Sequence, residues 1–234
     1  MSSPAERCFG VFTEPVKAFA SIARVPDFWT PLILETAITI AATEMLLSRV
    51  GMERIVRESI EASGRASSMS AQQLQTAISQ GAKYGSIFAH VSGVISMPIL
   101  VLVFAVVGMA IMKFVYGSAP RFKTAYSVTA YAALPLFLSG ILAIIVIVFG
   151  DPESIRAGNL TPTNIGFFLP LASTSRPLMS IAKSIDFFSF WVMGLLGIAF
   201  ASTTGGKAKP RNVFFFFLGL WVIFVLIRAG LAAI

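Results

Sequence analysis

Residues 126–149 read YSVTAYAALPLFLSGILAIIVIVF, a run of 24 residues that contains no charged side chain. At about 1.5 Å per residue, a helix of this length crosses a hydrocarbon layer of about 30 Å. The run shows no strand-like alternation, and a helix within lipid satisfies its own backbone hydrogen bonds. We therefore expect residues 126–149 to form a membrane-spanning helix.

Four further apolar runs are long enough to cross a membrane. They cover residues 28–47, 86–112, 185–204 and 213–234. Hydrophobic residues make up 56% of the 234-residue chain and charged residues only 12%, whereas soluble domains carry roughly 25% charge. The sequence therefore predicts an all-α, polytopic membrane bundle of five transmembrane helices that forms a single domain over residues 1–234.

The distribution of Lys and Arg predicts the orientation of the bundle. Segments 1–27, 113–125 and 205–212 carry the denser cations, whereas loops 48–85 and 150–184 mix cations with acids. The positive-inside rule then places the N-terminus in the cytoplasm and the C-terminus outside. The first 27 residues include three acids and lack the apolar core of a cleavable signal, so we expect the first span to direct insertion.

The N-terminal segment has the pattern of an amphipathic helix. Its apolar side chains recur at steps of three and four residues: Phe9, Phe12, Val16, Phe19 and Ile22. Thr13 is a candidate cap, with Pro15 in the first turn. Two placements remain open, because such a helix can lie in the lipid interface or pack on the cytoplasmic ends of the spans.

The cytoplasmic side of this topology also collects cations, which form a candidate lipid-binding or partner-binding face. They are Lys17, Arg24, Arg121, Lys123, Lys207, Lys209 and Arg211. Anionic headgroups are the expected partner, and nucleic acid is disfavoured because the cations are dispersed among membrane junctions. The alternative is that these cations only fix the orientation.

Several signals concern the loops and the packing of the spans. Loop 48–85 predicts two short helices, one around residues 52–62 and one that Ser70 caps and that ends near Gly81. Pro98 and Pro135 are expected to kink the second and third spans. Small residues at four-residue spacing predict close helix packing within the bundle, with homo-oligomer formation as the alternative. They are Gly85, Ala89 and Gly93, and then Gly197, Ala201 and Gly205.

Charges within the apolar runs are the best candidates for a functional site. Glu35 shares a helix face with Thr39 and Thr43, and the cost of burying a charge in lipid predicts that this face turns toward the bundle. Glu35 can serve as a structural lock, bonded to Ser, Thr or Tyr groups of other spans, or as a proton or ion relay. Asp186 and Arg228 both fall near the outer side, where they can form an ion pair.

Catalytic and metal-binding motifs do not occur in the sequence. It has no His-Glu-x-x-His zinc motif, no Gly-x-Ser-x-Gly elbow and no phosphate-binding Gly-rich loop. Cys8 and His90, the single residues of their types, are expected to be packing residues, and Glu44 is expected to reach the outer interface. We therefore expect no enzymatic activity, no cofactor and no metal.

One stretch resembles a known family. Residues 122–135, FKTAYSVTAYAALP, follow Gly117 and are similar to the central signature of the bacterial branch of the Yip family, relatives of Ypt/Rab-GTPase-interacting proteins. Residues 184–191, SIDFFSFW, with Gly194, Gly197 and the basic turn 207–211, resemble the fourth span of that family. The resemblance implies five spans, a bacterial inner membrane location and a cytoplasmic N-terminus.

The resemblance implies a non-enzymatic role. Eukaryotic members are scaffolds for Rab-type GTPases, but the Asp-Leu-Tyr-Gly-Pro motif of some of them is absent from this sequence. Some bacterial relatives are accessory subunits beside ABC-type exporters. We therefore expect an accessory or scaffold subunit that associates with other membrane proteins. A small transporter or channel that uses Glu35 is the alternative, and a lipid-handling or membrane-shaping protein is the third.

Overall fold

The computed structural model describes residues 3–170 and 173–233. Every named secondary-structure element in this part of the chain is a helix. The last residue of the expected fifth span, Ile234, lies outside the described residues. The α-helices are α1 (Pro4–Thr13), α2 (Pro15–Arg24), α3 (Trp29–Val50), α4 (Met52–Ala62), α5 (Ala71–Tyr116), α6 (Phe122–Ala132), α7 (Pro135–Phe149), α8 (Arg176–Ser184), α9 (Phe187–Ser202) and α10 (Pro210–Leu231). Two short 3₁₀ helices, η1 (Arg65–Ser68) and η2 (Ile165–Phe167), lie in the loops.

The prediction of an all-α polytopic membrane protein is confirmed. Four segments are long and apolar enough to cross a membrane: α3, α5, α6 with α7, and α10. The fourth expected span is shorter than residues 185–204, because α9 has 16 residues. Asp186 caps its start, and Gly205 and Gly206 follow its end with φ of 61° and 95°, a conformation that glycine adopts readily.

The N-terminal segment forms two helices, so the prediction of one helix is wrong. The break falls at Glu14, which has a φ of −138° and a ψ of 61°. Pro15 disfavours helical geometry at the residue before it and occupies the first position of α2. Thr13 does not cap α2, because its hydroxyl donates a hydrogen bond to the Phe9 carbonyl at 3.3 Å.

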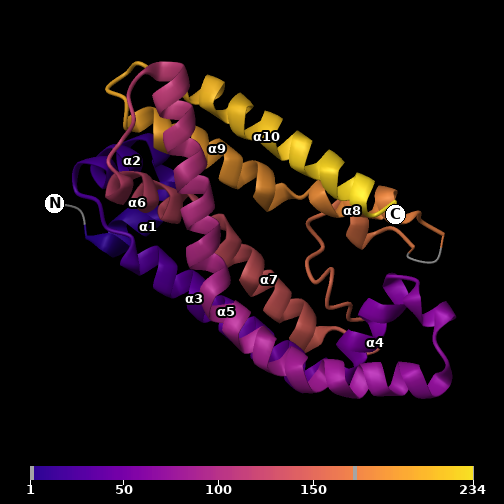
Figure 1. Ribbon diagram of the computed structural model, residues 1–234. Helices are drawn as coiled ribbons and strands as arrows, with labels where there is room; N and C mark the ends of the chain where they lie inside the picture. The colour runs from indigo at the N-terminus through magenta and orange to yellow at the C-terminus, as the bar shows by residue number, and fades with distance from the viewer. Residues whose placement is uncertain (1–2, 171–172, 234) are drawn as a thin grey trace.

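Helix α5 runs without interruption for 46 residues, so the expected separate helix that ends near Gly81 is wrong. The expected cap is present, since the hydroxyl of Ser70 accepts from the Gln73 N–H at 3.2 Å. Gly81 does not end the helix, since it lacks the positive φ of a terminating glycine, and Val56 of α4 packs against it. Pro98 lies inside α5, and Figure 1 shows that the helix curves along its length.

The third expected span is interrupted at Pro135, where α6 ends and α7 begins. Proline has no N–H to donate and occupies the first position of α7, as its fixed φ favours.

Small residues allow close packing between helices of the same chain. A Cβ on Gly197 would lie 2.8 Å from the Pro210 carbonyl oxygen, so α9 and α10 touch closely only because this residue is glycine.

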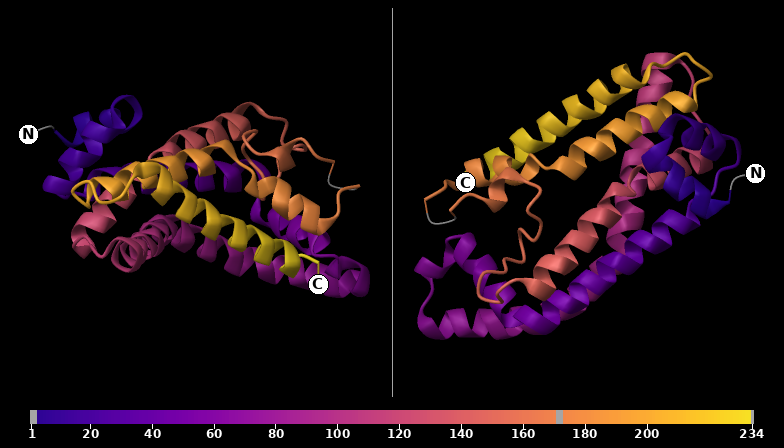
Figure 2. Two further views of the ribbon diagram at one scale, coloured as in Figure 1. Left: turned by 90° about the horizontal axis from the view of Figure 1, so that it is seen from above. Right: turned by 180° about the vertical axis from the view of Figure 1, so that it is seen from behind.

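The helices form two arms that meet at one end of the molecule (Figures 1 and 2). One arm contains α3, α7 and the first part of α5, and the other contains α8, α9 and α10. At the junction, which we call the closed end, α1, α2 and α6 pack with α9 and the last part of α5. The opposite end, which we call the open end, contains α4, α8 and the loop that follows α7.

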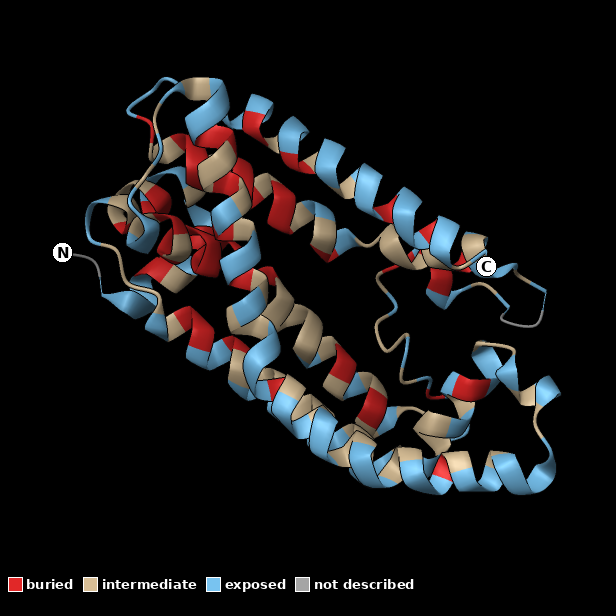
Figure 3. Cartoon of the chain, in the orientation of Figure 1, coloured by how far each residue is buried: buried red, intermediate tan, exposed pale blue. Residues whose placement is uncertain are grey.

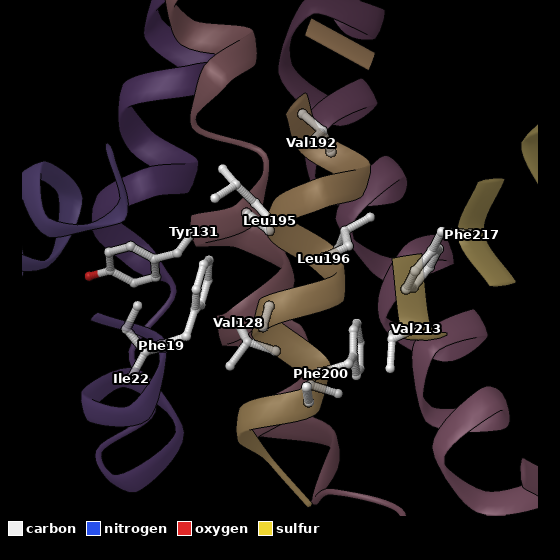
Figure 4. Close-up of a cluster of buried hydrophobic side chains, with 14 of the residues drawn as sticks. Phe19, Ile22, Val128, Tyr131, Val192, Leu195, Leu196, Phe200, Val213 and Phe217 are labelled. Carbon is white, nitrogen blue, oxygen red and sulfur yellow. The ribbon is translucent and has the colours of Figure 1, made fainter. Parts of the chain in front are cut away.

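Buried residues gather at the closed end (Figure 3). Figure 4 shows Phe19 and Ile22 of α2 beside Tyr131 of α6, with Leu196 and Phe200 of α9 in the same cluster. All five side chains are 0–1% exposed. The N-terminal helices are therefore fixed to the spans by an apolar core.

Candidate functional site

Glu35 is buried in α3, with 1% of the residue exposed. Neither carboxyl oxygen has a hydrogen-bond partner among residues 3–170 and 173–233. The expected lock, in which Ser, Thr or Tyr groups of other spans bind this carboxyl, is therefore wrong. Thr39 and Thr43 do not complete a polar site either, because their hydroxyls donate to the backbone carbonyls of Glu35 and Thr39 at 2.8 and 2.9 Å. Threonine in a helix readily bonds to the carbonyl four residues earlier.

A polar cluster that was not predicted from the sequence lies beside the N-terminal helices, and the electrostatic effect of Glu35 on Cys8 of α1 indicates that Glu35 is near it. The Tyr131 hydroxyl donates to Oδ2 of Asp27 at 3.4 Å, and Figure 4 shows this hydroxyl pointing away from the apolar side chains. The buried Arg7 donates to the Val25 carbonyl at 2.8 Å. The residues come from α1, the α2–α3 connection and α6, so only the tertiary fold assembles them.

The pKa of Cys8 shows the electrostatic effect of this cluster. Burial, followed by the nearby carboxylates of Asp27 and Glu35, raises the pKa of the Cys8 thiol to about 11. The thiol is therefore protonated at neutral pH and is a poor nucleophile. A buried carboxyl in a membrane protein is a candidate proton carrier. The chemistry that this cluster can support is therefore the binding and release of a proton at the carboxyl of Glu35. Within the described residues, no group of three or more His, Cys, Asp or Glu side chains could hold a metal ion.

Asp186 and Arg228 form no ion pair in the described structure, so this prediction is wrong. Asp186 binds its own neighbours instead: Oδ1 accepts from the Thr163 hydroxyl at 2.6 Å, and Oδ2 accepts from the Ser189 N–H at 3.0 Å. An antiparallel bridge between Asn164 and Asp186 brings the loop to this position. The Arg228 guanidinium lies 5.7 Å from the centre of the Phe224 ring.

Glu44 and His90 form a pair that the sequence analysis missed. The Glu44 carboxylate lies 2.7 Å from Nε2 of His90, and Nδ1 of His90 lies 2.5 Å from the Ser86 carbonyl oxygen. His90 is therefore an exposed polar residue rather than a packing residue. Both side chains are about half exposed.

The seven cations of the predicted lipid-binding or partner-binding face are all exposed. Figure 1 shows that α2, α6 and the α9–α10 connection, which carry them, lie at the closed end. A hollow of about 420 Å³ includes Lys17 and Arg24 in its lining, together with Arg7. Lys17 also forms an ion pair of 3.0 Å with Glu14.

The apolar stripe of the N-terminal segment is divided between two environments. Phe19 and Ile22 are fully buried in the core, whereas Phe9 is 71% exposed and Val16 is 64% exposed. One part of the stripe therefore packs on the spans, which is one of the two expected placements, and another part faces outward beside the cations.

The model of the Yip1 domain matches residues 9–230. The chain belongs to the Yip1 domain family. Yip1-domain proteins are generally non-enzymatic membrane proteins. The match includes α2, all of α3, α5, α6 and α7, and all but the last residue of α10, so α2 and the segments that could cross a membrane belong to one Yip1 domain match. Comparison with curated proteins and with solved structures gives no match.

Proposed function

We propose that this Yip1-domain protein is a non-enzymatic accessory or scaffold subunit of a membrane assembly, and that its closed end binds the partner. The observation that carries the proposal is the fixed position of α1 and α2. Phe19 and Ile22 anchor α2 in the core, while Phe9 and Val16 remain exposed beside exposed cations. A rigid apolar and basic surface can bind a partner without the entropic cost of ordering a flexible segment.

The finer assignment combines this surface with the sequence resemblance and the charge distribution. We place the protein in a bacterial inner membrane, with the closed end in the cytoplasm, as the positive-inside rule favours. An ABC-type exporter with its adaptor protein is the proposed assembly. In that position, the surface would contact acidic or apolar patches at the cytoplasmic side of the exporter.

Purification in a gentle detergent, followed by identification of the co-purifying proteins, tests this function. We expect exporter subunits to accompany the wild-type chain and to be lost when Lys207, Lys209 and Arg211 are all replaced by Gln. The matched control replaces three exposed cations outside this surface, Arg57, Arg65 and Lys83, by Gln. Equal recovery of partners with both triple variants, at unchanged orientation and thermal stability, would refute a partner-binding role for the basic turn.

A small transporter that uses Glu35 is the second candidate, because its buried carboxyl has no partner in the described structure. Reconstituted protein would then carry out proton-coupled transport, and Glu35→Gln would abolish it because an amide cannot release a proton. Glu44→Gln is the matched control, since Glu44 is exposed. Transport that survives Glu35→Gln would exclude this candidate.

A further inference from the structure

The open end contains a large cavity that the proposed function does not use. Its volume is about 1080 Å³, and its lining comes from α4, the loop after α7, α8 and the end of α10. Cavities that bind small organic ligands usually measure about 300–1,000 Å³. The cavity is therefore large enough for an organic molecule and much larger than a lone inorganic ion needs.

The charged side chains of the lining leave an excess of positive charge. Five are cations, Arg54, Arg156, Arg176, Lys183 and Arg228, and three are acids, Glu58, Glu61 and Glu153. Arg54 pairs with two of the acids, because its guanidinium lies 2.9 Å from Glu58 and 3.9 Å from Glu153. With five cations and three acids, the charged side chains of the lining have a net charge of +2.

Three of these cations line the same cavity without an acidic partner among the described residues. Arg156, Lys183 and Arg228 form no ion pair with a carboxylate in the part of the chain that the structure describes. Burial, Arg156 and Arg228 together lower the pKa of Lys183, in that order of size. The direction of this shift means that Arg156 and Arg228 each repel the ammonium group of Lys183. A bound anion would remove this repulsion.

The backbone around Lys183 is arranged to hold it in place. Gly166 lies so close to α8 that a Cβ there would be 2.9 Å from the Lys183 backbone nitrogen. Hydrogen bonds from the Ile165 N–H to the Ile185 carbonyl and from the Phe187 N–H to the Thr163 carbonyl fix the same loop. The cavity wall is therefore built into the fold rather than formed by loose surface lysines.

We propose that this cavity binds an organic anion that carries a phosphate group. Two guanidinium groups and an ammonium group suit phosphate, since Arg binds its oxygens in pairs and Lys adds a point charge. Arg228 lies in the last turn of α10, a helix long enough to cross the membrane, so the cavity is within reach of phospholipid headgroups. Leu178 of α8, 53% exposed, and Leu231 of α10, 68% exposed, supply apolar surface near the cavity that acyl chains could contact.

The test separates a phospholipid headgroup from a soluble phosphate ester. Full-length protein in nanodiscs of phosphatidylcholine, with or without phosphatidylglycerol, is analysed by native mass spectrometry for retained lipid. Protein in a neutral detergent is titrated with glycerol 3-phosphate by calorimetry. Saturable binding of either probe supports the cavity as a phosphate site, and the arm that succeeds identifies the source. Failure of both arms would overturn the proposal.

Substitutions localise the binding. We expect the double replacement Arg156→Gln and Lys183→Gln to weaken binding at least about tenfold, because each removes a charge-assisted hydrogen bond. Arg57→Gln with Arg65→Gln is the matched control, since these exposed cations are close in sequence to α4 lining residues but do not line the cavity. Equal losses in both double variants would show general charge attraction and overturn the proposal.

A stability measurement shows whether a variant loses binding because it misfolds. Without any anion, removal of a repelled cation should leave the thermal stability of the Lys183→Gln variant equal to or above that of the wild type. Arg228→Gln, which removes an exposed cation of α10, is a second single variant. Like Lys183→Gln, it should weaken the binding of the anion. Wild-type affinity in both single variants would contradict the proposed contacts.

Discussion

The two ends of the molecule are held together by different forces. At the closed end, α2, α6 and α9 bury side chains such as Phe19, Tyr131 and Phe200 completely. At the open end, arginines donate to backbone carbonyls: Arg49 bonds to Val148 at 2.7 Å, and Arg54 bonds to Pro152 at 2.6 Å. Apolar packing resists local opening more strongly than polar bonds near solvent do. We therefore expect the closed end to set global stability and the open end to change shape more easily.

The largest expected effect is at the closed end. Replacement of Phe200 by Ala should lower the free energy of unfolding by about 3–5 kcal/mol, because it leaves a cavity in the core. Phe149→Ala is the control: this residue at the end of α7 is 83% exposed, and its loss should cost less than about 0.5 kcal/mol. Reversible denaturation in detergent measures both values. Similar losses in the two variants would break the contrast between the ends.

The open end should respond to the loss of one arginine. Arg54→Gln removes hydrogen bonds to the carbonyls of Pro152 and Glu153 and the ion pair with Glu58, and we expect it to cost about 2 kcal/mol locally. Hydrogen exchange should then rise over residues 150–158 while the closed end keeps its protection. Arg57→Gln, an exposed neighbour, should leave the exchange unchanged. A uniform rise along the chain would mean that both ends unfold as one unit.

Glu35 of α3 is a buried carboxyl without a hydrogen-bond partner in the described residues, and its replacement should stabilise the protein. Glu35→Leu removes two buried oxygens that have no partner in the described residues, so we expect the free energy of unfolding to rise by about 1–2 kcal/mol. Glu35→Gln keeps polar atoms in the same place and should gain less. Denaturation of the three proteins side by side gives the order. A Leu variant less stable than the wild type would reveal a bond that holds the carboxyl.

The smallest expected effect concerns the Cys8 thiol. Its pKa is about 11 in the folded protein against an ordinary value of 9.0, so the raised pKa favours the protonated folded state. This contribution to stability is fully present below pH 9 and is lost between pH 9 and about pH 11. Denaturation of wild type and Cys8→Ser over that range measures the difference. The alkylation rate of folded Cys8 should also keep rising to about pH 11, and a plateau near pH 9 would contradict the raised pKa.

Local signals in the sequence predicted local structure well. The apolar runs indicated the spans, and loop 48–85 indicated both the helix Met52–Ala62 and the Ser70 cap. Those features depend on neighbouring residues in the chain. The continuity of α5 did not follow, because glycine occurs inside helices as well as at their ends, and the contact of Gly81 with Val56 of α4 is not visible in the sequence.

The sites could not be predicted in the same way. Asp186 was expected to pair with Arg228, but Thr163 is its partner, and only the position of the loop decides between them. The carboxyl of Glu35 was expected to find partners because burial requires them, yet the described core supplies none. The cluster of Arg156, Lys183 and Arg228 joins three distant segments, so charge counting along the chain gave no sign of it.

The length of helix α5 has a structural consequence. Its 46 residues extend over about 69 Å at about 1.5 Å each, whereas the hydrocarbon layer measures about 30 Å. More than half of the helix length therefore exceeds the thickness of the hydrocarbon layer, and α4 packs on the N-terminal part of the helix. Gly108, near the other end of the helix, touches the Phe200 ring. One continuous helix therefore connects α4 at the open end with the apolar core at the closed end.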